Sequence, residues 1–220
     1  MKYKLCIFDL DGTLIDTLDT IAHFVNGALA PHGLGPIERE RFKYFAGDGA
    51  RNLMTRSLGA AGGAPGILPR ALAEYNAAYN ANSLHLTTVY EGIPELLAGL
   101  RDAGVMSAVL TNKPHDTTGN VLSSLFPAGT FAAYSGDMPG RPLKPDPAGA
   151  FEMMRTLGVS PGECVYVGDT GTDMLTGKAA GLFTVGALWG FRGREELEGA
   201  GADAIIAHPA ELLGLLDEKL

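Results

Sequence analysis

Cysteine is scarce in this chain of 220 residues, and long apolar runs are missing from it. The two cysteines, Cys6 and Cys164, are too few for a disulfide scaffold. Each lies in an apolar segment typical of a strand, so we expect two small buried core residues in a reducing compartment. No apolar stretch approaches the length of a bilayer-spanning helix. Asp9 and Asp11 interrupt the apolar run near the N-terminus, which therefore does not resemble a signal peptide. These absences predict a soluble, cytoplasmic protein.

Positive charge is also in short supply. The formal net charge is −8 at pH 7, and lysine and arginine form no block anywhere in the chain. We therefore expect no nucleic-acid partner, because general attraction to phosphate backbones requires a basic surface. We expect no membrane partner either, and a monomer or a homodimer. An anionic substrate would have to be held by individual cations and not by the overall field of the protein.

Apolar periodicity divides the chain into a helical segment and an alternating one. Helical spacing predominates from about residue 16 to 86, with helices expected after Asp16 or Thr17, over 37–45, over 50–58, and through Leu72. From about residue 90 onward, helices alternate with expected strands at 105–110, 131–134, 165–167, 184–187 and 204–206. Such alternation predicts an α/β fold with a parallel sheet and right-handed crossovers. We predict a core of residues 1–15 and 87–220, with a helical domain inserted at 16–86.

The first strand carries the most informative motif. The apolar residues from Leu5 to Phe8 are too few for a helix and suit a central parallel strand, and Asp9, Asp11 and Gly12 follow directly. Open α/β sheets bind ligands at the carboxyl ends of their strands. Two carboxylates there would crowd together, which is costly without a cation or a shared proton. They indicate a metal site, or a nucleophile with its acid/base partner, although Asp-Gly after a strand is also a common turn.

Three further segments lie where strands or crossovers are expected to end. Thr111 and Asn112 offer a hydroxyl and an amide to a phosphate oxygen, or they form an ordinary strand-to-helix turn. Lys144 stands among three prolines, where a held ammonium can neutralise phosphate or a carboxylate, although a lone lysine is usually solvated. Asp169 and Asp173 follow an apolar strand and suit magnesium, or they only begin a helix. Carboxylates at both ends, with a hydroxyl and a lysine between them, fit phosphoryl transfer through an aspartyl-phosphate.

With all four segments present in this order, the chain resembles the haloacid dehalogenase-like superfamily, in the subclass with a helical cap inserted after the first motif. The resemblance implies a Rossmann-like core with helices on both faces of its sheet. It implies a magnesium-dependent phosphatase whose partner is a small phosphorylated metabolite. A dianionic phosphate approaches clustered carboxylates only if magnesium and lysine offset the repulsion.

The resemblance also implies a role for each motif residue. Asp9 matches the nucleophile, and Asp11 matches the general acid/base. Thr111 and Lys144 match catalytic residues that also bind the phosphoryl oxygens, with Asn112 beside them as a substrate-binding residue. The implied magnesium ligands are as follows: the Asp9 carboxylate, the Asp11 backbone carbonyl, Asp169, and Asp173 as a supporting acid.

Within the superfamily, several segments resemble phosphoglycolate phosphatases, among them residues 45–50, 111–114 and 190–192. This implies 2-phosphoglycolate as the substrate, with Arg51 pairing with its carboxylate beside a glycine-rich helix start. The alternatives are a phosphatase of another small substrate (a sugar phosphate, a nucleotide or pyrophosphate) or a phosphomutase. A non-enzymatic alternative is a phospho-accepting signalling module of the receiver type.

Overall fold

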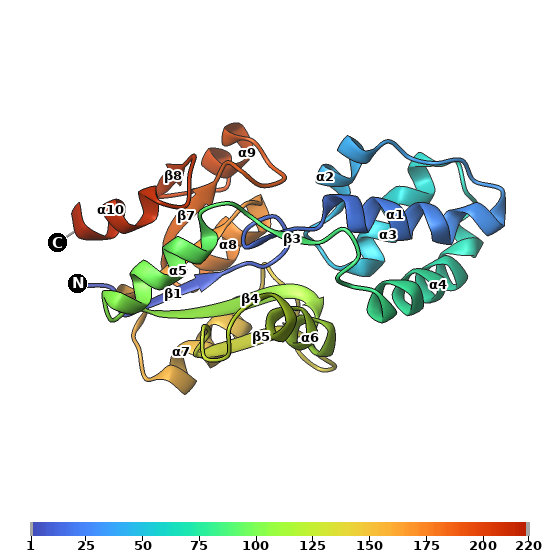
Figure 1. Cartoon of the computed structure of the whole chain (residues 1–220). Coiled ribbons are helices and arrows are strands. Elements are labelled where there is room, and N and C mark those ends of the chain that lie inside the picture. The colour runs from blue at the N-terminus through green and yellow to red at the C-terminus, as the bar shows by residue number, and fades with distance from the viewer. Residues whose placement is uncertain (1, 219–220) are drawn as a thin grey trace. The chain divides into compact units, whose positions relative to one another are not determined.

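The computed structural model describes residues 2–218 and divides the chain into two compact units. The core unit comprises Met1–Ile15 and Val89–Leu220, and the helical unit comprises Asp16–Thr88. The sequence placed these boundaries at 15/16 and 86/87. Two short strands, β2 (Ile15–Asp16) and β3 (Thr88–Val89), pair where the chain passes between the units (Figure 1).

The core unit is built on a six-stranded parallel sheet in the order β5-β4-β1-β6-β7-β8. Counted along the core strands alone, this is the order 3-2-1-4-5-6 of the Rossmann fold. The bounds of the strands are β1 Leu5–Phe8, β4 Met106–Pro114, β5 Ala133–Asp137, β6 Cys164–Gly168, β7 Phe183–Ala187 and β8 Ala204–Ile206. A receiver-type signalling module has the order 2-1-3-4-5 instead, so the topology contradicts that alternative.

Helices cover both faces of the sheet (Figure 1). The bounds of the core helices are α5 Ile93–Asp102, α6 His115–Leu125, α7 Ala148–Leu157, α8 Gly171–Ala179, α9 Arg194–Gly199 and α10 Glu211–Glu218. Single-turn 3-10 helices lie at 30–32, 39–41, 65–67 and 161–163.

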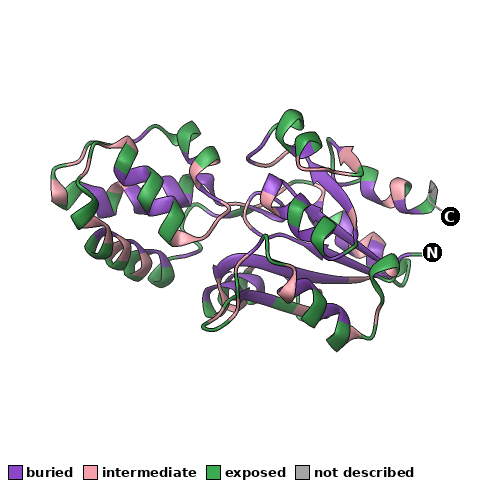
Figure 2. Ribbon diagram, turned by 180° about the vertical axis from the view of Figure 1, so that it is seen from behind, coloured by how far each residue is buried: buried purple, intermediate pink, exposed green. Residues whose placement is uncertain are grey.

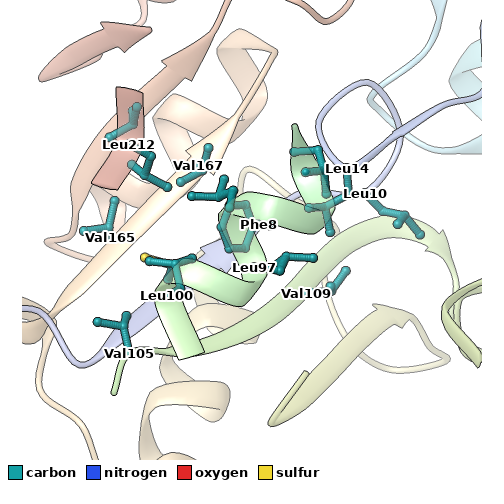
Figure 3. Close-up of a cluster of buried hydrophobic side chains, with 14 of the residues drawn as sticks. Phe8, Leu10, Leu14, Leu97, Leu100, Val105, Val109, Val165, Val167 and Leu212 are labelled. Carbon is teal, nitrogen blue, oxygen red and sulfur yellow. The ribbon is translucent and has the colours of Figure 1, made fainter. Parts of the chain in front are cut away.

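The alternating side chains of β1 supply two hydrophobic clusters, one on each face of the sheet. Cys6 and Phe8 pack with residues of α5, α6 and α10, and Figure 3 shows Phe8 among the side chains of this cluster. Leu5 and Ile7 pack with α7 and with the residues that follow α8. All four side chains are fully buried. Figure 2 shows the central strands of the sheet buried while the outer faces of the helices remain exposed. Both cysteines are free and buried, as the sequence predicted.

The helical unit has its own core. Its helices are α1 Leu18–Leu29, α2 Phe42–Phe45, α3 Ala50–Ala60 and α4 Leu68–Ala81. α1 packs against α4, where the rings of Phe24 and Tyr79 meet edge to face at 5.7 Å. The helix expected over 37–45 is shorter, because only a 3-10 turn and the four residues of α2 are helical there. No helix among residues 2–218 is long and apolar enough to cross a membrane.

Two expected elements differ in a way that affects the site. The strand expected over 105–110 runs on through Pro114, so Thr111 and Asn112 lie within β4 and not in a turn. The strand expected over 131–134 lies at Ala133–Asp137, where it pairs with residues 108–110 of β4 and, after a shift in register, with Pro114. The cause is tertiary: an apolar count ends at Leu110, whereas the neighbouring strand continues the pairing beyond it.

Candidate active site

The predicted carboxylates converge where the chain order of the sheet reverses. Asp9 follows β1, Asp169 follows β6, and these two strands are neighbours at the switch point. In open α/β sheets this crevice is where ligands bind. One carboxylate oxygen each of Asp9, Asp169 and Asp173 lies within 4.8 Å of the others, and all three residues are buried. The sheet order therefore assembles residues that are up to 164 positions apart in sequence.

Lys144 is the cation of this cluster. Its Nζ lies 2.9 Å from Oδ1 of Asp9 and 2.6 Å from Oδ1 of Asp173, and only 3% of its side chain is exposed. Lys144 is therefore not the solvated surface residue that an isolated lysine in a sequence usually is. Asn112 holds the lysine's backbone: its Nδ2 donates to Lys144 O at 3.1 Å, and its Oδ1 accepts from Lys144 N at 2.8 Å. The Asn112 amide thus positions Lys144, and its predicted contact with substrate stays a prediction.

Asp169 is held between two loops of the core unit. Thr13 Oγ1 donates to its Oδ1 at 2.7 Å, and the Phe191 N–H donates to its Oδ2 at 2.8 Å. A methyl group on Gly190 would lie 2.3 Å from both Asp169 Cβ and Gly12 O. Because there is no room for a side chain at Gly190, the loop after β7 presses directly on Asp169.

Asp173 both caps a helix and belongs to the carboxylate cluster. Its backbone N–H and its Oδ2 form a capping box with Thr170 at the start of α8, so its expected role at a helix start is also correct. Its other oxygen, Oδ1, accepts from Lys144 Nζ. Helix capping therefore fixes the orientation of a carboxylate that also balances the lysine.

The electrostatics show a cluster short of positive charge. Burial and the nearby Asp173 carboxylate raise the pKa of Asp9 to about 7, although Lys144 opposes this. Burial, with Asp173 and Asp9, holds the pKa of Asp169 well above its usual range. Burial lowers the pKa of Lys144, but the charges of Asp173 and Asp9 outweigh it and hold that pKa well above its usual range. One ammonium faces three carboxylates, and these shifts are the consequence.

The residues present fit a divalent cation. Oδ1 of Asp9 is buried and, although it is close to Lys144, it makes no hydrogen bond of regular geometry. Three carboxylate oxygens in one buried place are the hard donors that magnesium prefers. The Asp11 carboxylate is not part of this group of three. Asp11 stays a predicted ligand through its backbone carbonyl alone.

Asp11 has a lysine of its own. Lys113 Nζ lies 2.8 Å from Oδ1 and 3.0 Å from Oδ2 of Asp11. The strand ends at Phe8 and the chain turns at Gly12, so the strand geometry does not continue through Asp11. The nearby Thr111 is buried, and its Oγ1 accepts from Lys113 N at 3.3 Å.

Arg51 belongs to the helical unit. It is exposed in the first turn of α3, which begins after Gly49 without a side-chain cap. Arg56, one and a half turns later, bonds Asp48 and the Phe45 carbonyl and so ties down the loop before the helix. The substrate contact of Arg51 stays a prediction.

Sequence reasoning missed three contributors: Thr13, Lys113 and the Phe191 backbone. Thr13 and Lys113 stand inside the motifs that drew attention to Asp9, Asp11 and Thr111. Their position beside those residues is the only signal the sequence offered. Backbone N–H groups leave no trace in composition, so the Phe191 contact could not be found without the fold.

Comparison with known proteins agrees with the fold and the motifs. The family model described as haloacid dehalogenase-like hydrolase matches residues 6–187. The N-acetylmuramic acid 6-phosphate phosphatase of Pseudomonas aeruginosa is 32% identical over 100% of this chain and 97% of that protein. The phosphoglycolate phosphatase of Haemophilus influenzae is 30% identical over 98% of this chain and 99% of its own length.

A crystal structure of a putative phosphoglycolate phosphatase from Lactobacillus delbrueckii superimposes with a TM-score of 0.93 at 30% identity, over 98% of this chain and 99% of that one. The family model and these relatives each cover most or all of the chain. The chain therefore belongs to the haloacid dehalogenase-like hydrolases and groups there with the phosphoric monoester hydrolases.

Proposed function

We propose that the protein is a magnesium-dependent phosphatase that works through an aspartyl-phosphate on Asp9 and hydrolyses a small phosphate monoester carrying a carboxylate, with 2-phosphoglycolate as the preferred substrate. One observation carries the proposal. Asp9 and Asp11 follow the same strand, yet each is paired with its own buried lysine, and only Asp9 belongs to the carboxylate cluster. Two nearby carboxylates in different environments are suited to different chemical roles.

Asp9 is the nucleophile. One of its carboxylate oxygens attacks phosphorus, the bond from phosphorus to the ester oxygen breaks, and the leaving alkoxide takes a proton from the Asp11 carboxyl group. Lys144 and the Thr111 hydroxyl stabilise charge on the phosphoryl oxygens. The products of this step are the free alcohol and the acyl phosphate on Asp9.

Asp11 then acts in the opposite sense. Its carboxylate removes a proton from water, the water oxygen attacks phosphorus, and the bond from phosphorus to Asp9 breaks. Orthophosphate leaves, and Asp9 is again a carboxylate. Magnesium held by Asp9, Asp169, Asp173 and the Asp11 carbonyl would supply charge that allows a dianion to enter a cluster of carboxylates.

The relatives support a carboxylate-bearing substrate. Two of the relatives are named for their substrates, N-acetylmuramic acid 6-phosphate and phosphoglycolate. Both compounds are phosphate monoesters of acids. N-acetylmuramic acid 6-phosphate is the second candidate, because the relative named for it aligns over the whole of this chain. Arg51 is the residue we propose to pair with the carboxylate, since it is exposed at the start of α3.

The covalent intermediate is tested by brief reaction with substrate, acid quenching and peptide mass spectrometry. The phosphoryl group should map to Asp9, and Asp9→Asn should abolish turnover. Asp11→Asn should slow both half-reactions by about 10²–10⁴-fold. EDTA should stop the wild type, and added magnesium should restore it. Phosphate on another residue would contradict the scheme.

The substrate is tested by comparing kcat/KM for 2-phosphoglycolate, N-acetylmuramic acid 6-phosphate and 2-hydroxyethyl phosphate. The last compound matches 2-phosphoglycolate in length but has a neutral hydroxyl group in place of the carboxylate, and it serves as the neutral ester. A charged hydrogen bond contributes about 1.5–3 kcal/mol, so the two acids should exceed the neutral ester by about 10–10²-fold. Arg51→Ala should remove that preference, whereas Arg70→Ala, on the exposed side of α4, should not. A wild type that favours the neutral ester would refute the substrate and leave the phosphatase chemistry intact.

A further inference from the structure

The geometry points to Lys113 as a positioning residue that holds the Asp11 side chain in place for its work as general acid/base. The inference rests on the proposed function, because it concerns the same site and the same reaction. It gives a role to Lys113, which is the second buried lysine of the site.

The contact itself is specific. Lys113 Nζ reaches both oxygens of Asp11, at 2.8 Å and 3.0 Å. Only 3% of the Lys113 side chain is exposed, compared with 21% for that of Asp11. A buried ammonium therefore pairs with both oxygens of a carboxylate that is only partly buried.

The backbone that carries Lys113 packs closely against a neighbouring strand. Lys113 lies in β4, and its neighbour Pro114 pairs with Asp137 of β5 after a shift in register beyond Leu110. A methyl group on Gly136 would lie 2.4 Å from Lys113 O, so β5 approaches the Lys113 backbone as closely as a glycine allows. Asp11, in contrast, follows the end of β1 and lies in an isolated bridge to Ile15. Because the lysine is the more buried partner and its backbone is packed against β5, we infer that it determines where the carboxylate lies.

The two lysines divide the work. Lys144 pairs with Asp9 and Asp173 inside the cluster, and Lys113 pairs with Asp11 outside it. Neither lysine can replace the other, since each is buried on a different segment. Loss of Lys113 should therefore misplace Asp11 and leave the charge around Asp9 unchanged. A displacement of about 1 Å in a reacting group can cost about 10²-fold in rate.

The test is a double-mutant cycle on kcat and KM for 2-phosphoglycolate with Lys113→Met and Asp11→Asn, singly and together. Lys113→Met keeps the length of the side chain and removes its charge. We expect kcat to fall about 10–10²-fold with KM within about threefold. In the Asp11→Asn background the same substitution should change kcat by less than about threefold, because the group it positions is gone. Lys113→Arg should recover part of kcat.

Lys178→Met is the matched control, because it breaks an exposed lysine–aspartate pair with Asp203 and should leave both constants unchanged. Melting temperatures identify any variant that fails to fold. If Lys113→Met does not fold, Lys113→Arg, which keeps the charge, is compared with the wild type instead. A Lys113→Met effect of equal size in the Asp11→Asn background, or one confined to KM, would overturn the inference in favour of direct substrate binding. An active wild type with unchanged Lys113→Met kinetics would overturn the inference alone. A wild type without phosphatase activity would overturn the proposed function as well.

Discussion

At the scale of single residues, two aspartates that are close in sequence have different surroundings in the site. Asp9 and Asp11 are two positions apart, and Lys113 and Lys144 are both buried, yet each aspartate has a different lysine. Asp9 shares its lysine with Asp173. Burial among other carboxylates raises the pKa of Asp9, whereas the Asp11 side chain is partly exposed. The residue type is the same at both positions, and the different surroundings are the basis for the separate roles that we propose for the two carboxylates.

Lys144 is the residue whose loss should be most costly. Lys144→Ala leaves Asp9 and Asp173 buried without their cation, and breaking a buried pair costs about 3–5 kcal/mol. Turnover should fall by about 10²–10³-fold, as expected for a preorganised charge. Urea unfolding and steady-state kinetics measure the two effects. Lys178→Ala, which breaks a more exposed pair, is the control and should do neither. Unchanged turnover in a folded Lys144→Ala protein would exclude a catalytic role.

At the scale of elements, the loop after β7 fixes the carboxylate that follows β6. Trp189 Nε1 donates to Thr13 O at 2.9 Å, and Thr13 Oγ1 in turn donates to Asp169. The next two residues complete the contact, Gly190 by its closeness and Phe191 through its N–H. The turn after β1, the end of β6 and the loop after β7 thus form one unit around Asp169.

Gly190→Ala should therefore weaken magnesium binding. The added methyl must displace Asp169 or the Gly12 carbonyl, since it would lie 2.3 Å from each. Trp189 is the chain's single tryptophan, so its fluorescence reports on this loop during a magnesium titration. We expect the magnesium Kd to rise by about tenfold or more, in the range found when groups that orient metal ligands are changed. Gly193→Ala, where a methyl group meets nothing, is the control. Equal titrations of the two variants would show that the loop does not position Asp169.

At the scale of the whole molecule, the charge balance of the fold is incomplete without a cation. The chain has a net charge of −8, and three of its carboxylates share one buried place. Crowded carboxylates destabilise the folded state unless a positive charge offsets them. Lys144 supplies one such charge, through its ion pairs with Asp9 and Asp173.

Magnesium should consequently stabilise the folded protein. A ligand that binds the folded state at 100 times its Kd adds about 2.7 kcal/mol, so the Tm should rise by several degrees in scanning calorimetry. Asp169→Asn should lose most of that rise, because one of the three carboxylates is gone. Sodium chloride at matched ionic strength is the control for screening. A Tm that responds equally to both salts would contradict a specific site.

The sequence by itself determined most strands, the order of the four motifs and the residue types at the site. These signals are local: β1 and β6 are short apolar runs, and β8 was expected at the residues where it lies. The family resemblance rests on the same local motifs, and the matching family model confirms it. The end of β4 could not be predicted from the sequence, because its last residues have no apolar pattern and the strand is completed by pairing with β5 at Pro114.

Only the tertiary structure decided which groups meet. Lys113 and Lys144 look alike in sequence, and β4 brings the first to Asp11 while the segment after β5 brings the second to Asp9. The Phe191 N–H reaches Asp169 because β7 lies beside β6. Ion pairs and hydrogen bonds act over about 3 Å, whereas their partners stand up to 176 positions apart in the chain. Patterns among residues that are close in sequence do not predict contacts that depend on the order of the strands in the sheet.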